Sequence, residues 1–188
     1  MNFKSEGPPF KNFHPVTDPR YGDVCHCTKD SHFATYIKYS RTYISKKEAV
    51  GVVEDIKKRL NCKSKFFVPP ADFRFEHIRH FCTNECIVGL FVQKPKCDLK
   101  QEISFRIKNN ISFTGRELMR LIYQTIRGME AVYGMGLTHT KVGPEWIERS
   151  QRGYRVIDDP LHDKNICEEL NSRTKAFYLS PEAYKFVR

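Results

Sequence analysis

Long apolar runs are missing from this sequence. The longest, residues 87–92, contains six residues, whereas a helix that crosses a bilayer needs about 20. Residues 1–9 have neither the apolar core nor the cleavage pattern of a signal peptide. The seven cysteines are odd in number and irregularly spaced, which fits a reducing compartment better than a disulfide scaffold. We therefore expect a soluble cytoplasmic protein with no membrane partner.

Acidic residues are scarce relative to basic ones. The 188 residues include 32 lysines and arginines but only 22 aspartates and glutamates, which gives a net charge of +10. Such a positive field favours an acidic partner, which can be an acidic protein surface, a nucleic acid or an anionic membrane. The length suits one domain, or a small domain with an arm.

The most informative stretch is residues 137–147, LTHTKVGPEWI. It resembles the catalytic loop of protein kinases, H-R-D-L-K-P-E-N, in which the Asp accepts the substrate proton and the Asn holds magnesium. His139, Pro144 and Glu145 match this pattern. The other chemically important positions are replaced, the Arg by Thr140, the Asp by Lys141, the loop Lys by Gly143 and the Asn by Trp146. A cation cannot act as the base, and an indole cannot bind a hard metal ion.

Two further landmarks follow in the family's order. Residues 154–160, YRVIDDP, resemble the strand that leads into the D-F-G motif. Asp158 keeps the metal-binding Asp, whereas Asp159 replaces the Phe and Pro160 replaces the Gly. Residues 178–182, YLSPE, resemble the motif that closes the activation segment. The chain is therefore similar to the protein kinases and is identified as a degenerate member, a pseudokinase.

The resemblance implies an α+β fold. We expect a kinase-like small lobe over residues 17–94, with an antiparallel five-stranded sheet and one helix, and an incomplete, mainly helical large lobe over residues 95–188. Prolines and aromatic residues predict an extended arm over residues 1–16. The chain ends six residues after Glu182, so we expect a truncated large lobe. Its long helix, over residues 113–136, should then expose apolar surface unless an obligate protein partner covers it.

Capping patterns predict where the helices begin. Ser45 opens a helix that runs to about residue 60, Asp98 opens a short helix, and Thr114 opens the long one. The segments expected to form the fourth and fifth strands of the sheet are residues 65–68 and residues 86–92.

The resemblance implies that few features of a nucleotide pocket are kept. In the family's register, Gly22 is the last glycine of the phosphate-covering loop and Val24 lies over the base, whereas the two earlier glycines are replaced. The strand-three lysine falls on Tyr36, with Lys38 as the alternative further along the same face. Glu54 is nearest to the helix position that pairs with this lysine, and a solvated acidic residue is the alternative interpretation.

Potential metal ligands gather in one segment, and they form a weak alternative zinc site. The ligands would be His77, His80, Cys82 and Cys86. Zinc prefers four nitrogen or sulfur ligands in a tetrahedron. The spacing contains no C-x-x-C pair, and alternation along a strand points His77 away from the next two ligands. We therefore favour ordinary hairpin residues and predict no metal.

These observations predict a catalytically inactive kinase-like protein that acts as a structural or interaction subunit of a larger intracellular assembly. A cytoskeletal assembly, such as a microtubule, an axoneme or a cilium, is one concrete form. No cofactor is predicted, although ATP could bind without catalysis. One alternative is a regulatory pseudokinase switch that binds nucleotide through Gly22, Val24, Lys38 and Asp158. A basic nucleic-acid-binding protein is the less favoured alternative, because no recognition signature accompanies the charge.

Overall fold

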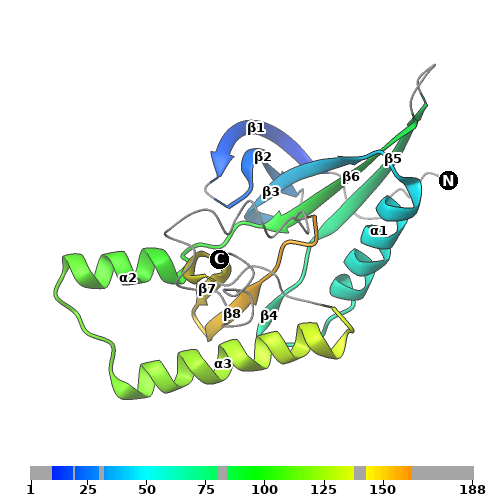
Figure 1. The fold of residues 1–188 in the computed structure, drawn as a ribbon. Helices are drawn as coiled ribbons and strands as arrows, with labels where there is room; N and C mark the ends of the chain where they lie inside the picture. The colour runs from blue at the N-terminus through cyan, green and yellow to red at the C-terminus, as the bar shows by residue number, and fades with distance from the viewer. Residues whose placement is uncertain (1–9, 19, 30–31, 80–83, 138–142, 162–188) are drawn as a thin grey trace, which may run out of the picture.

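The computed structural model describes residues 10–18, 20–29, 32–79, 84–137 and 143–161 (Figure 1). The fold is α+β, as predicted. A five-stranded antiparallel sheet has the strand order β1-β2-β3-β6-β5, and a second sheet has the order β4-β8-β7. The strands of the first sheet are β1 (Phe10–Asp18), β2 (Gly22–Lys29), β3 (His32–Tyr43), β5 (Asp72–Arg79) and β6 (Asn84–Gln93).

The first strand corrects the expected arm of residues 1–16. β1 begins at Phe10 and pairs with β2, so residues 10–16 belong to the sheet. Pro15 is accommodated because β1 is an edge strand, where a missing N–H breaks no ladder hydrogen bond. The ring of Phe10 is buried and stacks on Phe91, with 4.0 Å between ring centroids. Residues 1–9 lie outside the described residues.

Helix α1 (Lys46–Leu60) packs against the five-stranded sheet (Figure 1). The Ser45 side chain accepts a hydrogen bond from the backbone N–H of Glu48 and so caps the helix as predicted. The buried side chains of α1, including Ala49, Val53 and Ile56, join the largest apolar cluster of the described residues. This core fixes the position of α1 relative to β3 and β6.

The second sheet and two helices form the rest of the described fold. They comprise β4 (Phe67–Val68), α2 (Leu99–Lys108), α3 (Gly115–Gly134), a 3₁₀ turn (Pro144–Trp146), β7 (Ile147–Ser150) and β8 (Gly153–Ile157). Residues 65–68 were expected to form the fourth strand of the large sheet. Instead, β4 pairs in parallel with β8, and β5 occupies the place beside β6.

Helix α3 runs along β8 (Figure 1). Thr114 and Glu117 form a full capping box at its start, as predicted. Gly128 allows the close approach, because a Cβ atom there would lie 2.5 Å from the backbone oxygen of Phe66 and from Val156 Cγ2. None of the helices in the described segments is long and apolar enough to cross a membrane.

Candidate functional site

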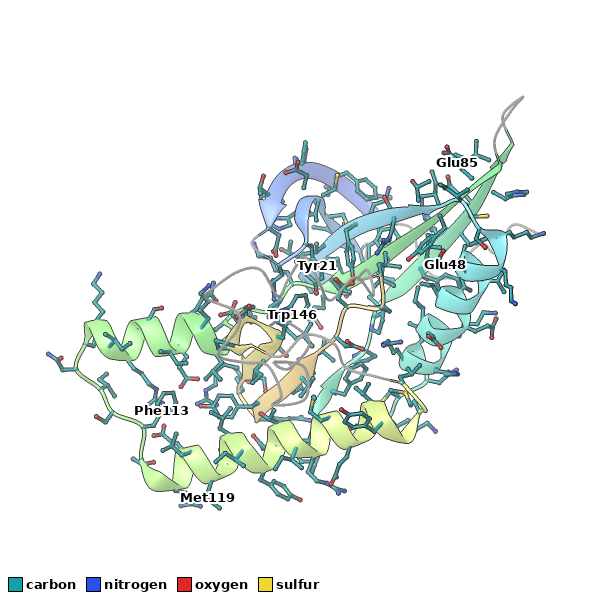
Figure 2. All side chains as sticks on the ribbon, in the orientation of Figure 1. Tyr21, Glu48, Glu85, Phe113, Met119 and Trp146 are labelled. Carbon is teal, nitrogen blue, oxygen red and sulfur yellow. The ribbon has the colours of Figure 1, made fainter. Side chains whose placement is uncertain are left out.

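Three aromatic side chains from distant parts of the sequence meet between the two sheets. Tyr21 precedes β2, Tyr39 lies on β3, and Trp146 ends the 3₁₀ turn. The rings of Tyr21 and Tyr39 stack, with centroids 4.4 Å apart. The ring of Trp146 meets Tyr21 edge-on at 5.4 Å, and Figure 2 shows these two side chains next to each other. We call Tyr21, Tyr39 and Trp146 the aromatic cluster.

The aromatic cluster is joined to the segment that follows β8. Tyr39 Oη donates a hydrogen bond of 2.7 Å to Asp159 Oδ1. The same oxygen accepts from the backbone N–H of Leu161 at 3.1 Å, which holds the chain in a tight turn. Arg41, two residues beyond Tyr39 on β3, donates to the Leu161 carbonyl oxygen at 3.0 Å. The turn after β8 is therefore fixed to one face of β3.

Asp158 is held by an arginine from α1. Both the Nε atom and a terminal nitrogen of Arg59 lie 2.7 Å from Asp158 Oδ2. The side chains of Arg59 and Asp158 are only 6% and 2% exposed. The other carboxylate oxygen, Oδ1, accepts from the backbone N–H of Asp159 at 3.0 Å. Both oxygens that could bind a metal ion are therefore engaged within the protein.

Burial controls the protonation of the two cluster tyrosines. Removal from water raises the pKa of Tyr39, and the negative charge of Asp159 raises it further. Burial and then the charge of Asp159 likewise raise the pKa of Tyr21. Both phenols are neutral at physiological pH, so Tyr39 can act as the hydrogen-bond donor that the Asp159 carboxylate requires.

The residue of β3 that reaches this site differs from the predicted ones. Tyr36 packs with Phe10 and Phe91 in a separate apolar cluster, and Lys38 Nζ lies 5.4 Å from the centroid of the Phe13 ring. Alternate residues of a strand point to opposite faces, so Tyr39 faces Asp159 while Tyr36 and Lys38 do not. Tyr36 and Lys38, the two candidates for the strand-three lysine position, therefore lie on the face of β3 opposite to Tyr39.

Two other predicted pocket residues, Gly22 and Val24, belong to β2. Val24 is buried in the main core together with Ile37 and Leu161. Gly22 has a φ angle of +72°, a backbone conformation that glycine adopts readily, directly after Tyr21. These two positions help to place the aromatic cluster, but neither side chain provides a polar group for a ligand.

The predicted helix glutamate is replaced in the site by an arginine. Glu54 lies on the exposed side of α1, where it forms an ion pair of 2.8 Å with Lys57. Arg59 instead occupies the buried side, three residues after Ile56. Its place on the buried stripe was the sequence signal that could have identified it, because an arginine is rarely buried without a partner.

Several residues of the degenerate catalytic loop lie outside the described residues. His139, Thr140 and Lys141 belong to this group. Gly143 precedes the 3₁₀ turn that positions Trp146. Pro160 follows Asp158 and Asp159 and is half-buried. The structure therefore brings Trp146, Asp158 and Asp159 to one site beside β3.

The alternative zinc site is described only in part. His77 on β5 lies directly opposite Cys86 on β6, whereas His80 and Cys82 are not among the described residues. Within the described segments, no group of three or more His, Cys, Asp and Glu side chains is arranged to hold a metal ion.

A second notable surface lies on α3. Large apolar side chains are exposed along it, namely Leu118, Met119, Ile122, Tyr123, Ile126 and Tyr133. We call this set the outer face of α3. Figure 2 shows Met119 on the side of α3 that points away from the three-stranded sheet. The sequence predicted apolar exposure on this helix.

Comparison of the chain with protein-family models and with curated proteins gives no match.

Proposed function

We propose that this chain is a catalytically inactive kinase-like protein that acts as an interaction subunit of a larger intracellular assembly. The order of elements supports the kinase-like part of this proposal. In chain order, α1 follows β3 and precedes β5, which are the third and fourth strands of the five-stranded sheet along the sequence. α2, α3 and the β7–β8 hairpin come later in the chain. This is the order that the resemblance implies for a small lobe and the upper part of a large lobe.

The observation that carries the proposed lack of activity is that the Asp158 carboxylate is already bound by other groups of the protein. The family uses the first Asp of its D-F-G motif to hold magnesium. Here, Asp158 is neutralised by Arg59 and is also hydrogen-bonded to the backbone. A metal ion would have to displace a buried arginine, and leaving such a charge unpaired costs about 3–5 kcal/mol.

The aromatic cluster provides a second line of support. Trp146 stands where the resemblance places the second metal ligand, and its buried ring packs against Tyr21. Tyr39 donates to Asp159 from the strand on which the family places its phosphate-binding lysine. A neutral phenol supplies no positive charge to a phosphate. Losing one such preorganised electrostatic contact typically costs about 10²–10³-fold in rate.

Phosphotransfer assays test this proposal. The purified full-length chain is incubated with magnesium and radiolabelled ATP, with generic protein substrates and without them. We expect no transfer above that of a buffer blank. A stoichiometric or catalytic transfer that persists after repeated purification would overturn the proposal.

The binding role is supported by the outer face of α3 and by the positive charge. Six large apolar side chains of one helix are exposed, and contiguous exposed apolar surface marks interaction sites in soluble proteins. The net charge of +10 favours an acidic protein surface as the partner. An acidic cytoskeletal polymer, such as a microtubule, is one partner with this chemistry.

A further inference from the structure

The outer face of α3 lies opposite the side that packs on β8. Gln124, Gly128 and Val132 are the buried positions of the helix. At about 100° per residue, Ile122 and Ile126 fall on the opposite side of the helix axis, and each is 52% exposed. A surface helix normally places polar residues there. α3 therefore has apolar residues on both its packed and its exposed sides.

A basic groove runs along one edge of this face. Its volume is about 1190 Å³, and it lies between α3, the β7–β8 hairpin and the segment after β6. Lysine and arginine side chains line it, namely Lys65, Lys94, Lys96, Arg120, Arg127, Arg149, Arg152 and Arg155. Glu148 is the acidic residue in the lining. The groove is therefore a strongly positive surface.

Some of these cations are neutralised by neighbours and others are directed at the groove. Arg155 pairs with Glu148, Arg149 with Glu102, and Arg127 with Glu130. Within the described residues, Lys65, Lys94, Lys96, Arg120 and Arg152 form no ion pair with a carboxylate. The groove thus keeps positive charge for an external ligand.

The helix α3 connects the apolar and the basic surfaces. Tyr123 belongs to both, because it is an exposed member of the outer face and also lines the groove. Arg120 and Arg127 lie on the groove edge of the same helix. The Arg120 guanidinium donates to the Arg152 carbonyl oxygen at 2.7 Å, which holds it at this edge. One elongated ligand could therefore contact both surfaces at once.

We infer that the outer face of α3 and the adjoining basic groove bind an acidic amphipathic helix of a protein partner. This inference rests on the proposed interaction role and specifies its partner. Apolar side chains of the partner helix, spaced three or four residues apart, pack on Met119, Ile122 and Ile126. Its carboxylates face Arg120 and Lys96 on the groove side.

Other occupants satisfy only part of this surface. A nucleic acid would neutralise the groove but leave the apolar side chains of Ile122 and Ile126 in water. A second copy of the chain would cover the apolar side chains but bring together two molecules that each carry a net charge of +10. An acidic amphipathic helix complements both properties.

Designed peptides of about three heptads test the inference, because such helices match the length of α3. One peptide has leucines at helical spacing and glutamates elsewhere. The matched peptides have lysines in place of the glutamates, or the same composition in scrambled order. We expect the full-length chain to bind the acidic amphipathic peptide in fluorescence anisotropy, at least about tenfold more tightly than either control.

Variants locate the binding surface. Ile122→Glu places a charge in the contact and should weaken binding of the acidic peptide by about tenfold or more. Ile44→Glu is the matched control, because Ile44 is 89% exposed and lies outside both surfaces. Lys96→Glu should weaken binding through the groove, whereas Lys47→Glu on α1 should not. Circular dichroism confirms that each variant is folded.

Four outcomes would overturn the inference. They are failure of the acidic peptide to bind, equal binding of the lysine peptide, binding that Ile122→Glu does not weaken, and tighter binding of a 20-nucleotide single-stranded RNA. Self-association that Ile122→Glu abolishes would assign the face to a second copy instead. Phosphotransfer activity would defeat the proposed inactive role alone, so the two failures are distinguishable.

Discussion

Arg59 and Asp158 form a buried ion pair that joins α1 to the end of β8. Single substitutions can test the contribution of this pair to stability. Each partner neutralises a charge that would otherwise be costly to bury. Tyr39 acts similarly toward Asp159, because it gives that carboxylate a donor inside the protein. These residues make both buried carboxylates into structural contacts.

Replacing Arg59 tests this structural role. Arg59→Leu leaves the Asp158 carboxylate buried without its cation, and we expect it to lower the free energy of unfolding by about 3–5 kcal/mol. The double variant Arg59→Leu with Asp158→Leu removes both charges and should recover most of that loss. Urea denaturation measures both. A loss below about 1 kcal/mol for Arg59→Leu, typical of exposed pairs, would contradict the account.

Tyr39 gives a pH-dependent prediction. Its pKa is raised in the folded protein by burial and by Asp159, whereas the unfolded value is near 10. The unfolded state therefore loses this proton first, so the stabilising contribution is complete below pH 10 and decreases as the pH rises above it. Tyr39→Phe should destabilise the protein at neutral pH and make the alkaline loss of stability shallower. Equal slopes for both proteins above pH 10 would argue against a buried neutral Tyr39.

At the scale of elements, α3 has to lie very close to β8. Gly128 permits this approach, and Thr114 with Glu117 caps the helix start. Capping boxes are local patterns, so the starts of α2 and α3 could be predicted from the sequence. The register of β3 could not, because a slip of one residue exchanges the two faces of a strand. The sequence pointed to Tyr36, with Lys38 as the alternative, whereas the β3 residue that contacts Asp159 is Tyr39.

Gly128→Ala tests the contact between α3 and β8. The added methyl group meets the backbone oxygen of Phe66 and the side chain of Val156. We expect a loss of about 1–3 kcal/mol in the free energy of unfolding, as for other overpacked sites. Gly51→Ala on α1 is the control, because nothing lies within 4 Å of its added Cβ. It should leave stability unchanged or raise it by up to about 1 kcal/mol. Equal effects of the two changes would contradict this packing.

At the scale of the whole molecule, contacts between residues far apart in the sequence determine the structural features that local sequence patterns could not predict. The resemblance implied the α+β class and a five-stranded sheet, and capping predicted the start of α1. β1 was hidden by Pro15 and by the prolines that precede the strand, and Pro15 is tolerated because the strand lies at the sheet edge. The Arg59–Asp158 pair joins residues 99 positions apart, and no local pattern reveals such a partner. The same holds for the meeting of Tyr21 with Trp146.

The positive charge of the whole molecule predicts how it meets an acidic polymer. We expect the chain to co-sediment with microtubules at low ionic strength, and the bound fraction to fall as salt rises past about 0.15 M, where the screening length is about 8 Å. Lys65→Glu combined with Lys96→Glu should reduce binding at low salt. Absence of co-sedimentation at every ionic strength would remove microtubules as the acidic partner.

The central claim is that the side chains of the aromatic cluster, Asp158 and Asp159 pack against one another and against Arg59, and that this site does not serve a nucleotide. The most direct measurement is the melting temperature of the full-length chain with and without magnesium and ATP. A ligand at about 100 times its dissociation constant stabilises a folded protein by about 2.7 kcal/mol, a shift of several degrees at this size. The account predicts no shift at millimolar MgATP. A reproducible shift of about 5 °C or more that Asp158→Ala abolishes would contradict it.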